Sequence, residues 1–390
     1  MIRGGGARTH EVALLHALAA FRRLRSFSLQ LGESAMDLHM LAGILLRAPQ
    51  LTEVQLDIPF RAEAGVTALF PVLLRCHRVH LRVSMTDVEE EVLGRLARMC
   101  ATSPPAWTQL RLSLKHNMVT DAGVAHLVAI ADGCPQLEDL HLNLSYVPMG
   151  MAGLRQLVEL PAVARRLRRC VLKLDSDLPH PERLDTGLHV DARHLEALRL
   201  SMAFTVVVGF DRLQLGPRLH RLELDLEGCR FGGRGAVAAL AAALAGAAPT
   251  LRTLVLRMVA MQLTDAQLVP LLQHGVGALH RLERAVLNIG GNPITDAAVD
   301  AVVAHLPASV RHLSLDVGDA RGVHRLDLAS RTLLEGLHLC ASATTVVALG
   351  LPDNLVQLGL DLDDAHLLLP DGLRLPHSRL PCVRRKQTKK

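Results

Sequence analysis

Aromatic residues are scarce in this sequence of 390 residues. Phe, Trp and Tyr together make up 2%, with a single tryptophan, Trp107, and a single tyrosine, Tyr146. A buried core must therefore consist mainly of leucine, valine and alanine, which agrees with a hydrophobic content of 49%. Proteins that bind single-stranded nucleic acid usually stack the bases on aromatic side chains. The shortage of aromatics disfavours that class, although the sequence pI of about 9.0 favours it.

Paired cysteines, catalytic motifs and membrane spans are missing as well. The seven cysteines are scattered and odd in number, which argues against a disulfide framework or a zinc ribbon and fits a reducing compartment such as the cytoplasm. No GxSxG, HExxH or Walker-type glycine loop is present. No stretch approaches the roughly 20 unbroken apolar residues of a membrane span. We therefore expect no enzyme, metal, cofactor, small-molecule substrate or membrane contact.

One pattern, LxxLxLxL, is abundant instead. It begins at residues 24, 51, 76, 107, 137, 167, 195, 219, 251, 282, 310, 334 and 355. Alternation with a period of two predicts a strand with one buried face. Between most of these strands the apolar residues recur at i, i+3 and i+4, as in Val124, Leu127 and Val128, which predicts a helix. Each repeat is thus predicted to be a strand, a turn and a helix.

The triplet Thr-Asp-Ala marks the start of three predicted helices. A threonine hydroxyl at this position can accept a hydrogen bond from an unpaired helix N–H, and an aspartate in the first turn suits the helix dipole. A short polar side chain after the strand can bond the backbone of the turn. The predicted cap residues are Thr120, Asp121, Thr264, Asp265, Thr295 and Asp296, and the predicted turn residues are Asn117, Cys229 and Asn292.

The strands, the Asn/Cys turn position and the segments TDAGVAHL, TDAQLVPLL and TDAAVDAVVAHL resemble the leucine-rich repeat family, in its ribonuclease-inhibitor-like class. The resemblance implies an α/β solenoid shaped as a curved horseshoe, with parallel strands on the concave face and helices on the convex face. It also implies that the concave face binds another protein. The helical pattern fades around 167–222 and beyond 310, where we expect irregular loops or short turns.

The expected organisation has three parts. Residues 1–23 form an N-terminal segment with a capping or partial-repeat helix over Val12–Phe21, residues 24–370 form a solenoid of about 13 repeats, and residues 371–390 form a basic, disordered tail. The basic tail CVRRKQTKK is a candidate nuclear-import signal, so a nuclear location is an alternative to the cytoplasm. Whether residues 11–21 cap the solenoid or the chain is part of a longer protein stays open.

The x positions between the strand leucines point away from the core and predict the binding surface. In the first and middle repeats they predict a basic stripe, which would attract an acidic partner. The candidate partner-binding residues are Arg78, His80, Arg82, Arg111, His141, Arg169, Lys173 and Arg199. Later repeats carry Glu223, Asp225, Asp316 and Asp361, interrupted by Arg257 and Arg284, and predict a more acidic end.

The function that these patterns favour is a non-enzymatic scaffold for protein–protein interaction. Two alternatives within the same family stay open: a GTPase-activating or other regulatory repeat protein, and the substrate-recognition subunit of a ubiquitin ligase. The basic tail disfavours the first, because the GTPase-activating group commonly has an acidic one. The second lacks room for an adaptor-binding domain before the first repeat. A nucleic-acid binder is the weakest alternative. The sequence does not determine the oligomeric state.

Overall fold

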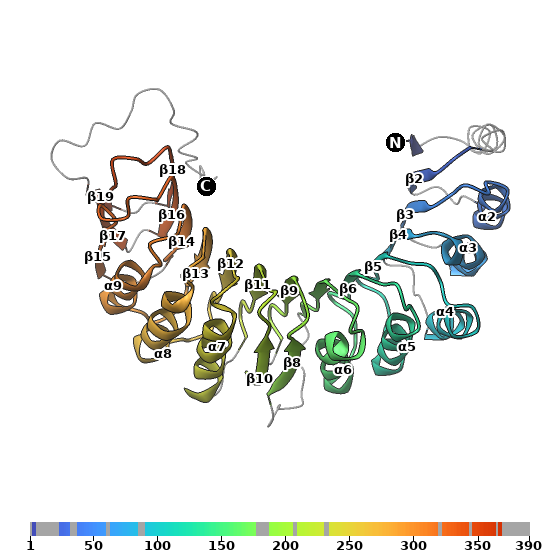
Figure 1. The fold of residues 1–390 in the computed structure, drawn as a ribbon, viewed down its shortest axis with the longest axis horizontal. Helices are drawn as coiled ribbons and strands as arrows, with labels where there is room; N and C mark the ends of the chain where they lie inside the picture. Colours follow the sequence, from blue (N-terminus) through green and yellow to red (C-terminus); the bar gives the residue numbers. More distant parts are fainter. Residues whose placement is uncertain are drawn as a thin grey trace, which may run out of the picture. The chain divides into compact units, whose positions relative to one another are not determined.

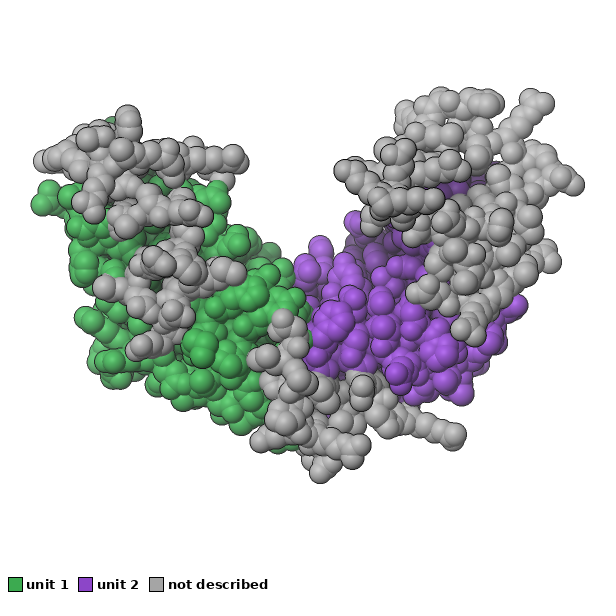
Figure 2. Space-filling view, turned by 180° about the vertical axis from the view of Figure 1, so that it is seen from behind, with its two compact units in different colours: residues 1–182 green, residues 183–390 purple. Residues whose placement is uncertain are grey.

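A computed structural model describes residues 2–4, 23–31, 37–59, 63–84, 90–176, 187–205, 209–229, 234–318, 322–342, 345–363 and 366–368. The predicted N-terminal helix over 12–21 and the predicted tail over 371–390 lie outside these residues. The chain forms two compact units, residues 1–182 and residues 183–390 (Figure 2).

Unit 1 is a parallel sheet with helices on one of its faces (Figure 1). Its strands pair in chain order, each in parallel with the next. The strands are β1 (Ile2–Gly4), β2 (Ser26–Leu31), β3 (Glu53–Pro59), β4 (Arg78–Ser84), β5 (Gln109–Ser113), β6 (Asp139–Asn143) and β7 (Arg169–Lys173). The helices are α2 (Leu38–Leu46), α3 (Glu63–Arg75), α4 (Glu90–Thr102), α5 (Asp121–Asp132) and α6 (Met151–Val163).

Unit 2 also has a parallel sheet backed by a second layer. The sheet contains, in order, β9 (Ala197–Ser201), β11 (Arg221–Asp225), β12 (Thr253–Arg257), β13 (Arg284–Asn288), β14 (His312–Asp316), β16 (Gly336–Ser342) and β18 (Gln357–Asp363). The helices are α7 (Arg234–Ala247), α8 (Asp265–Pro270) and α9 (Asp296–His305), and α8 continues as a π-helix over Leu271–Gly275 and a 3₁₀ turn over Val276–Ala278.

Every one of the thirteen LxxLxLxL segments contains one of these sheet strands, and β1 is an additional strand that the pattern did not predict. The fold is therefore a solenoid of leucine-rich-repeat type, as predicted. Equivalent positions of neighbouring strands are paired without a shift, so Leu224 lies beside Leu256 and Leu256 beside Leu287. This register places the same repeat position on the same face of every strand.

The core of each unit is a stack of aliphatic side chains between the sheet and the outer layer. The strand leucines are almost completely buried, with Leu222, Leu224, Leu254 and Leu256 all 0% exposed. Full burial of a leucine contributes about 2 kcal/mol relative to leaving it in water. The single tryptophan, Trp107, is buried too, and its indole N–H donates to the carbonyl oxygen of Leu73 at 2.7 Å. Stability therefore comes mainly from aliphatic side chains buried in successive repeats.

The connections where the helical pattern fades contain strands rather than the predicted irregular loops. In unit 2, β8 (Leu188–Ala192) pairs in parallel with β10 (Phe210–Leu215), and β10 lies next to α7. Beyond α9, strands β15 (Gly322–Asp327), β17 (Thr345–Gly350) and β19 (His366–Leu368) form a second small sheet. The prediction of loops was wrong because a short outer strand needs few residues and leaves no helical period in the sequence.

The predicted cap residues connect consecutive repeats. Asp121, at the start of α5, accepts hydrogen bonds from the backbone N–H groups of Gly150 and Gly153, at the start of α6, at 2.7 and 2.9 Å. Asp265, at the start of α8, accepts from the backbone and hydroxyl of Thr295, at 3.0 and 2.6 Å. The aspartate of one repeat therefore caps the helix of the next.

The threonines differ from one another in this role. Thr295 accepts a hydrogen bond from the N–H of Ala297 at 3.3 Å, as predicted for a cap. Thr264 forms a capping box with Gln267, in which the N–H of Thr264 donates to the side chain of Gln267 at 3.1 Å. The hydroxyl of Thr120 makes no cap bond and donates to the carboxylate of Glu90, so the predicted hydroxyl cap is wrong there. Asp296 lies in the first turn of α9, as predicted.

The predicted turn residues are buried and bond the preceding repeat. The side-chain amide of Asn292 donates to the carbonyl oxygens of Met258 and Ile289 at 2.7 and 2.8 Å, and its oxygen accepts from the N–H groups of Met261 and Leu263. Asn117 donates to the carbonyl oxygen of Val83 at 2.7 Å. The Cys229 thiol donates to the carbonyl oxygen of Met202 at 3.0 Å. A polar side chain at this position thus joins one turn to the next.

Candidate functional site

The candidate site is the open face of the sheet, which we define as the face turned away from the helices. Three rows of side chains cross it in unit 1, because the strands are in register. Row 1 is Ser26, Glu53, Arg78, Gln109, Asp139 and Arg169. Row 3 is Ser28, Gln55, His80, Arg111, His141 and Val171. Row 5 is Gln30, Asp57, Arg82, Ser113, Asn143 and Lys173. Seven of the eight predicted partner-binding residues lie in these rows, and Arg199 lies in unit 2.

Three of the predicted arginines, Arg78, Arg82 and Arg169, pair with a carboxylate on the preceding strand. Arg78 pairs with Glu53 at 3.8 Å and Arg82 pairs with Asp57 at 3.6 Å, both between β3 and β4. All four side chains are at least a quarter exposed, so each pair contributes well under about 1 kcal/mol to stability. The pairs nevertheless cancel charge locally, so this edge of unit 1 is less basic than the arginines alone suggest.

Asp139 anchors a network of row 1 across β5, β6 and β7. Its carboxylate accepts from the side-chain amide of Gln109 at 2.9 Å and pairs with Arg169 at 3.3 Å. Asp139 is only 8% exposed, so its charge needs both partners. Arg169, predicted to contact a partner protein, is thereby held by its own sheet.

The middle of the face keeps cations that are not neutralised. Within the described residues, no carboxylate forms an ion pair with Arg111 or Lys173. Burial, followed by the nearby guanidinium of Arg111, lowers the pKa of His80, so this imidazole is neutral at neutral pH. His141 lies on the other side of Arg111, on β6. The predicted basic stripe is thus concentrated at Arg111 and Lys173.

The open face of unit 2 carries the acidic residues that the sequence places there, and several are paired. Glu223 is 7% exposed and contacts Arg199 at 3.3 Å and Arg221 at 2.6 Å. Asp225 pairs with Arg257 at 3.4 Å. Arg199, the last predicted partner-binding residue, is therefore occupied by a buried carboxylate.

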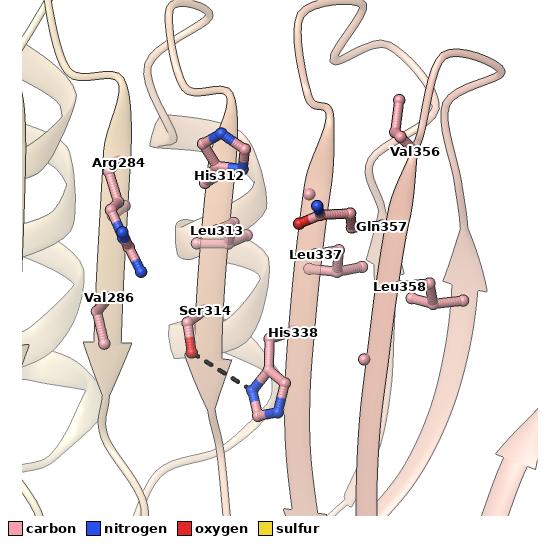
Figure 3. Close-up of a pocket in the computed structure, with 13 residues that line it drawn as sticks. Arg284, Val286, His312, Leu313, Ser314, Leu337, His338, Val356, Gln357 and Leu358 are labelled. Atoms are coloured by element: carbon pink, nitrogen blue, oxygen red, sulfur yellow. Dashed lines mark hydrogen bonds between the residues drawn. The ribbon is translucent and has the colours of Figure 1, made fainter. Parts of the chain in front are cut away.

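A groove of about 830 Å³ lies on the open face of unit 2, over β13, β14, β16 and β18 (Figure 3). The prediction of binding residues missed it. Gly336 and Gly359 stand at outward positions of β16 and β18, where other strands carry side chains. A glycine at an x position, as in LEGLHL and LVQLGL, is the sequence signal that could have located a hollow in this face.

The turns after the strands hold residues in the left-handed backbone region. Three residues past the strand end, φ is positive in His116, Tyr146, Phe204, Gly228, Ala260 and Gly291. The rings of His116 and Tyr146 stack at 4.8 Å between centroids, and the Lys115 ammonium lies 5.0 Å from the Tyr146 ring. This conformation could not be predicted from the residue types, because four of these six residues are not glycine.

The described cysteines are free thiols, and burial favours the neutral form of three of them. Burial raises the pKa of Cys76 to about 11, and burial with the nearby Asp139 raises that of Cys170 to about 12. The half-buried Cys340, on the open face, has its pKa raised to about 11 by burial and by Asp316 and Asp361. These thiols are poor nucleophiles at neutral pH.

Two other kinds of site are absent from the described part of the chain. No group of three or more His, Cys, Asp or Glu side chains is arranged to hold a metal ion. None of the described helices combines the length and apolar character that crossing a membrane requires.

Similarity to known proteins is found among solved structures. No family model matches the sequence, and no curated protein matches it. Among solved structures, the chain is similar to the crystal structure of the complex of Rad7 and Elc1 in yeast. The match covers 81% of this chain and 85% of that chain, with a TM-score of 0.37 and 14% sequence identity. The assignment to the leucine-rich-repeat type of fold rests on the thirteen strands and their turns.

Proposed function

We propose that this chain is a non-enzymatic scaffold that binds an acidic segment of a partner protein on the open face of unit 1. Arg111 and Lys173 are the residues that would contact the partner. The proposal rests on one observation. Arg78, Arg82 and Arg169 are paired within the sheet, whereas no described carboxylate pairs with Arg111 or Lys173.

The geometry of these two residues defines the partner further. Arg111 lies in row 3 of β5 and Lys173 in row 5 of β7, two strands apart. With strands about 4.8 Å apart and rows roughly 6.6 Å apart, their Cα atoms are separated by about 12 Å. Two carboxylates at a similar spacing on the partner would meet both cations. The sheet holds both side chains at fixed positions, which limits the ordering cost of binding.

The finer assignments belong to the same proposal. Strand–turn–helix repeats with Asn or Cys in the turn support the ribonuclease-inhibitor-like class of leucine-rich repeats. The six described cysteines, all free thiols, support a reducing compartment, cytoplasmic or nuclear.

The test is capture of proteins from a nuclease-treated native lysate by the full chain, washed at low and then high salt and analysed by mass spectrometry. The double variant Arg111→Glu/Lys173→Glu is compared with Arg165→Glu/Arg166→Glu, which makes the same change of charge in an exposed turn of unit 1. We expect a stoichiometric partner on the wild type and the control, and at least tenfold less on the double variant. Equal capture by both variants would contradict the proposal.

A further inference from the structure

The groove on unit 2 differs from the rest of the open face because side chains are missing from its floor. Gly336 on β16 pairs with His312 on β14, and Gly359 on β18 pairs with His338 on β16. A Cβ atom at Gly336 would lie 2.6 Å from Nδ1 of His312, and a Cβ at Gly359 would lie 2.6 Å from Cδ2 of His338. Each imidazole therefore occupies the space where a side chain of the glycine on the next strand would begin. The groove stays hollow above these rings because the glycines carry no side chain.

Polar atoms converge on Gly336 from two sides. His312 extends from β14 and Gln357 extends from β18, and the Gln357 Oε1 atom lies 3.7 Å from the position of a Cβ at Gly336 (Figure 3). His338 lies within 3.5 Å of the Ser314 hydroxyl. These side chains can donate several hydrogen bonds to one bound group.

The charge of the groove has one sign. Its lining includes Arg284 and two imidazoles, and no carboxylate is among the described residues that line it. The described residues also provide no ion pair for Arg284. Asp316 on β14 and Asp361 on β18 lie at the strand position of Cys340, outside the lining. A carboxylate of a bound ligand could therefore pair with Arg284 without displacing a carboxylate of the protein itself.

The rest of the lining is apolar. Val286 and Leu358 are half-buried and Val356 is 60% exposed, whereas Leu337, at 2% exposed, belongs to the core. A hollow that combines an apolar lining with a few polar groups favours a ligand with an apolar side chain of its own. The groove extends over four strands, a distance of about 14 Å at the usual strand spacing.

We propose that this groove is a second docking site, which binds a short acidic segment of a protein that also carries apolar side chains. The carboxylates of the segment pair with Arg284 and accept from His312, and its apolar side chains lie against Val356 and Leu358. This site is separate from the proposed site on unit 1.

Two other occupants fit the groove less well. A nucleic acid strand needs several cations and aromatic rings to stack on, and the lining holds one arginine and no Phe, Tyr or Trp. The C-terminal residues 369–390 of this chain contain seven Arg and Lys against one Asp, so Arg284 would repel them.

The test uses fluorescence polarisation with a fluorescein-labelled seven-residue peptide of alternating aspartate and leucine, with blocked ends. Two control peptides replace the aspartates by lysine or the leucines by serine. The full-length chain carries Arg111→Glu in every measurement, so that the site on unit 1 cannot contribute. We expect saturable binding of the aspartate–leucine peptide and none of either control.

Protein variants then locate the binding. Arg284→Gln should weaken binding at least about tenfold, because a charge-assisted pair is lost. Gly336→Leu should abolish it by filling the groove, while the His312 ring can turn aside. Arg281→Gln removes a nearby exposed charge outside the groove and should bind as its parent does. Thermal unfolding verifies that each variant is folded.

The proposal is overturned if the peptide does not saturate, if the lysine or serine peptide binds equally well, or if Arg284→Gln and Gly336→Leu bind like Arg281→Gln. The proposal would also be overturned, in favour of a nucleic-acid site, if a single-stranded oligonucleotide displaced the labelled peptide at a lower concentration than the unlabelled peptide does. None of these outcomes bears on Arg111 and Lys173, so failure here is distinguishable from failure of the proposed function.

Discussion

Unit 1 and unit 2 have the same strand register but very different open faces. In unit 1 each outward position carries a side chain, and ion pairs between neighbouring strands leave Arg111 and Lys173 as the cations without a carboxylate partner among the described residues. In unit 2 the pairs around Glu223 and Asp225 give way to a groove floored by Gly336 and Gly359. One framework thus carries a charged surface in one unit and a hollow one in the other.

The comparison separates two kinds of residue. The inward leucines and the turn side chains determine the framework and are interchangeable between units, since Asn117 and Asn292 serve the same role. The outward residues vary without affecting the framework, because they contact solvent and neighbouring strands only. Binding properties can therefore change from repeat to repeat while the fold is kept.

The largest effect is expected for the alkylation rate of Cys340, the half-buried cysteine on the open face of unit 2. With a pKa of about 11, about one thiol in a thousand is ionised at pH 8. Alkylation by iodoacetamide should accelerate about tenfold per pH unit and level off near pH 11, as mass spectrometry can follow on the folded chain. Asp316→Asn should raise the rate at pH 8, because one carboxylate that disfavours the thiolate is removed. A rate independent of pH between 7 and 9 would contradict this.

The second effect concerns the shared framework in unit 2. Asn292→Ala leaves two buried carbonyls and two buried N–H groups without their partner and should destabilise unit 2 by about 4 kcal/mol. Asn288→Ala, at the end of β13, removes a single half-buried acceptor and should cost less than about 1 kcal/mol. Urea unfolding of both variants measures the difference, and similar values for the two would show that the turn asparagine is dispensable.

A third effect compares the helix caps of the two units. Asp121→Ala removes two hydrogen bonds to backbone N–H groups at a partly buried site, and we expect a loss of about 2 kcal/mol. Asp265→Ala acts at an exposed site and should cost about 1 kcal/mol. Thermal unfolding can rank the two variants. The reverse order would mean that the hydrogen bonds of each aspartate to the next repeat stabilise the chain less than its interaction with the dipole of its own helix.

The smallest effect concerns the left-handed turn residues. Ala260 has φ +52, a conformation that strains any residue with a Cβ atom. Ala260→Gly should stabilise unit 2 by roughly 0.5 kcal/mol, since relief of strain exceeds the added entropy of the unfolded chain. The matched reverse change, Gly291→Ala, starts from φ +68 and should destabilise by about 1 kcal/mol. If both changes have the same sign, the backbone conformation does not decide the outcome.

Much of the fold could be predicted from the sequence because its signals are local and repeated. Thirteen strands follow from the leucine pattern, and the buried turn residues Asn117, Cys229 and Asn292 follow from their spacing after the strands. The outer strands β8, β10, β15, β17 and β19 could not be predicted in this way. They pair with each other across repeats, and a single short strand carries no period that distinguishes it from a loop.

The candidate site was predicted less completely, because its properties depend on neighbours in space. Arg82 and Arg111 look alike in the sequence, yet Asp57 lies beside Arg82 and no described carboxylate pairs with Arg111. The Asp121 side chain reaches the next helix, 29 residues away, rather than its own. The groove depends on two missing side chains, which a search for chemical groups overlooks.

The most direct test of the central claim asks which face of unit 1 meets the partner. A photo-crosslinking benzoylphenylalanine is placed at Ser113, in row 5 on the same strand as Arg111 and two strands from Lys173, or at Gln156, on the exposed surface of α6. We expect a crosslink to the captured partner from position 113 and none from position 156. A crosslink from position 156 alone would contradict it, because the partner would then bind the helices.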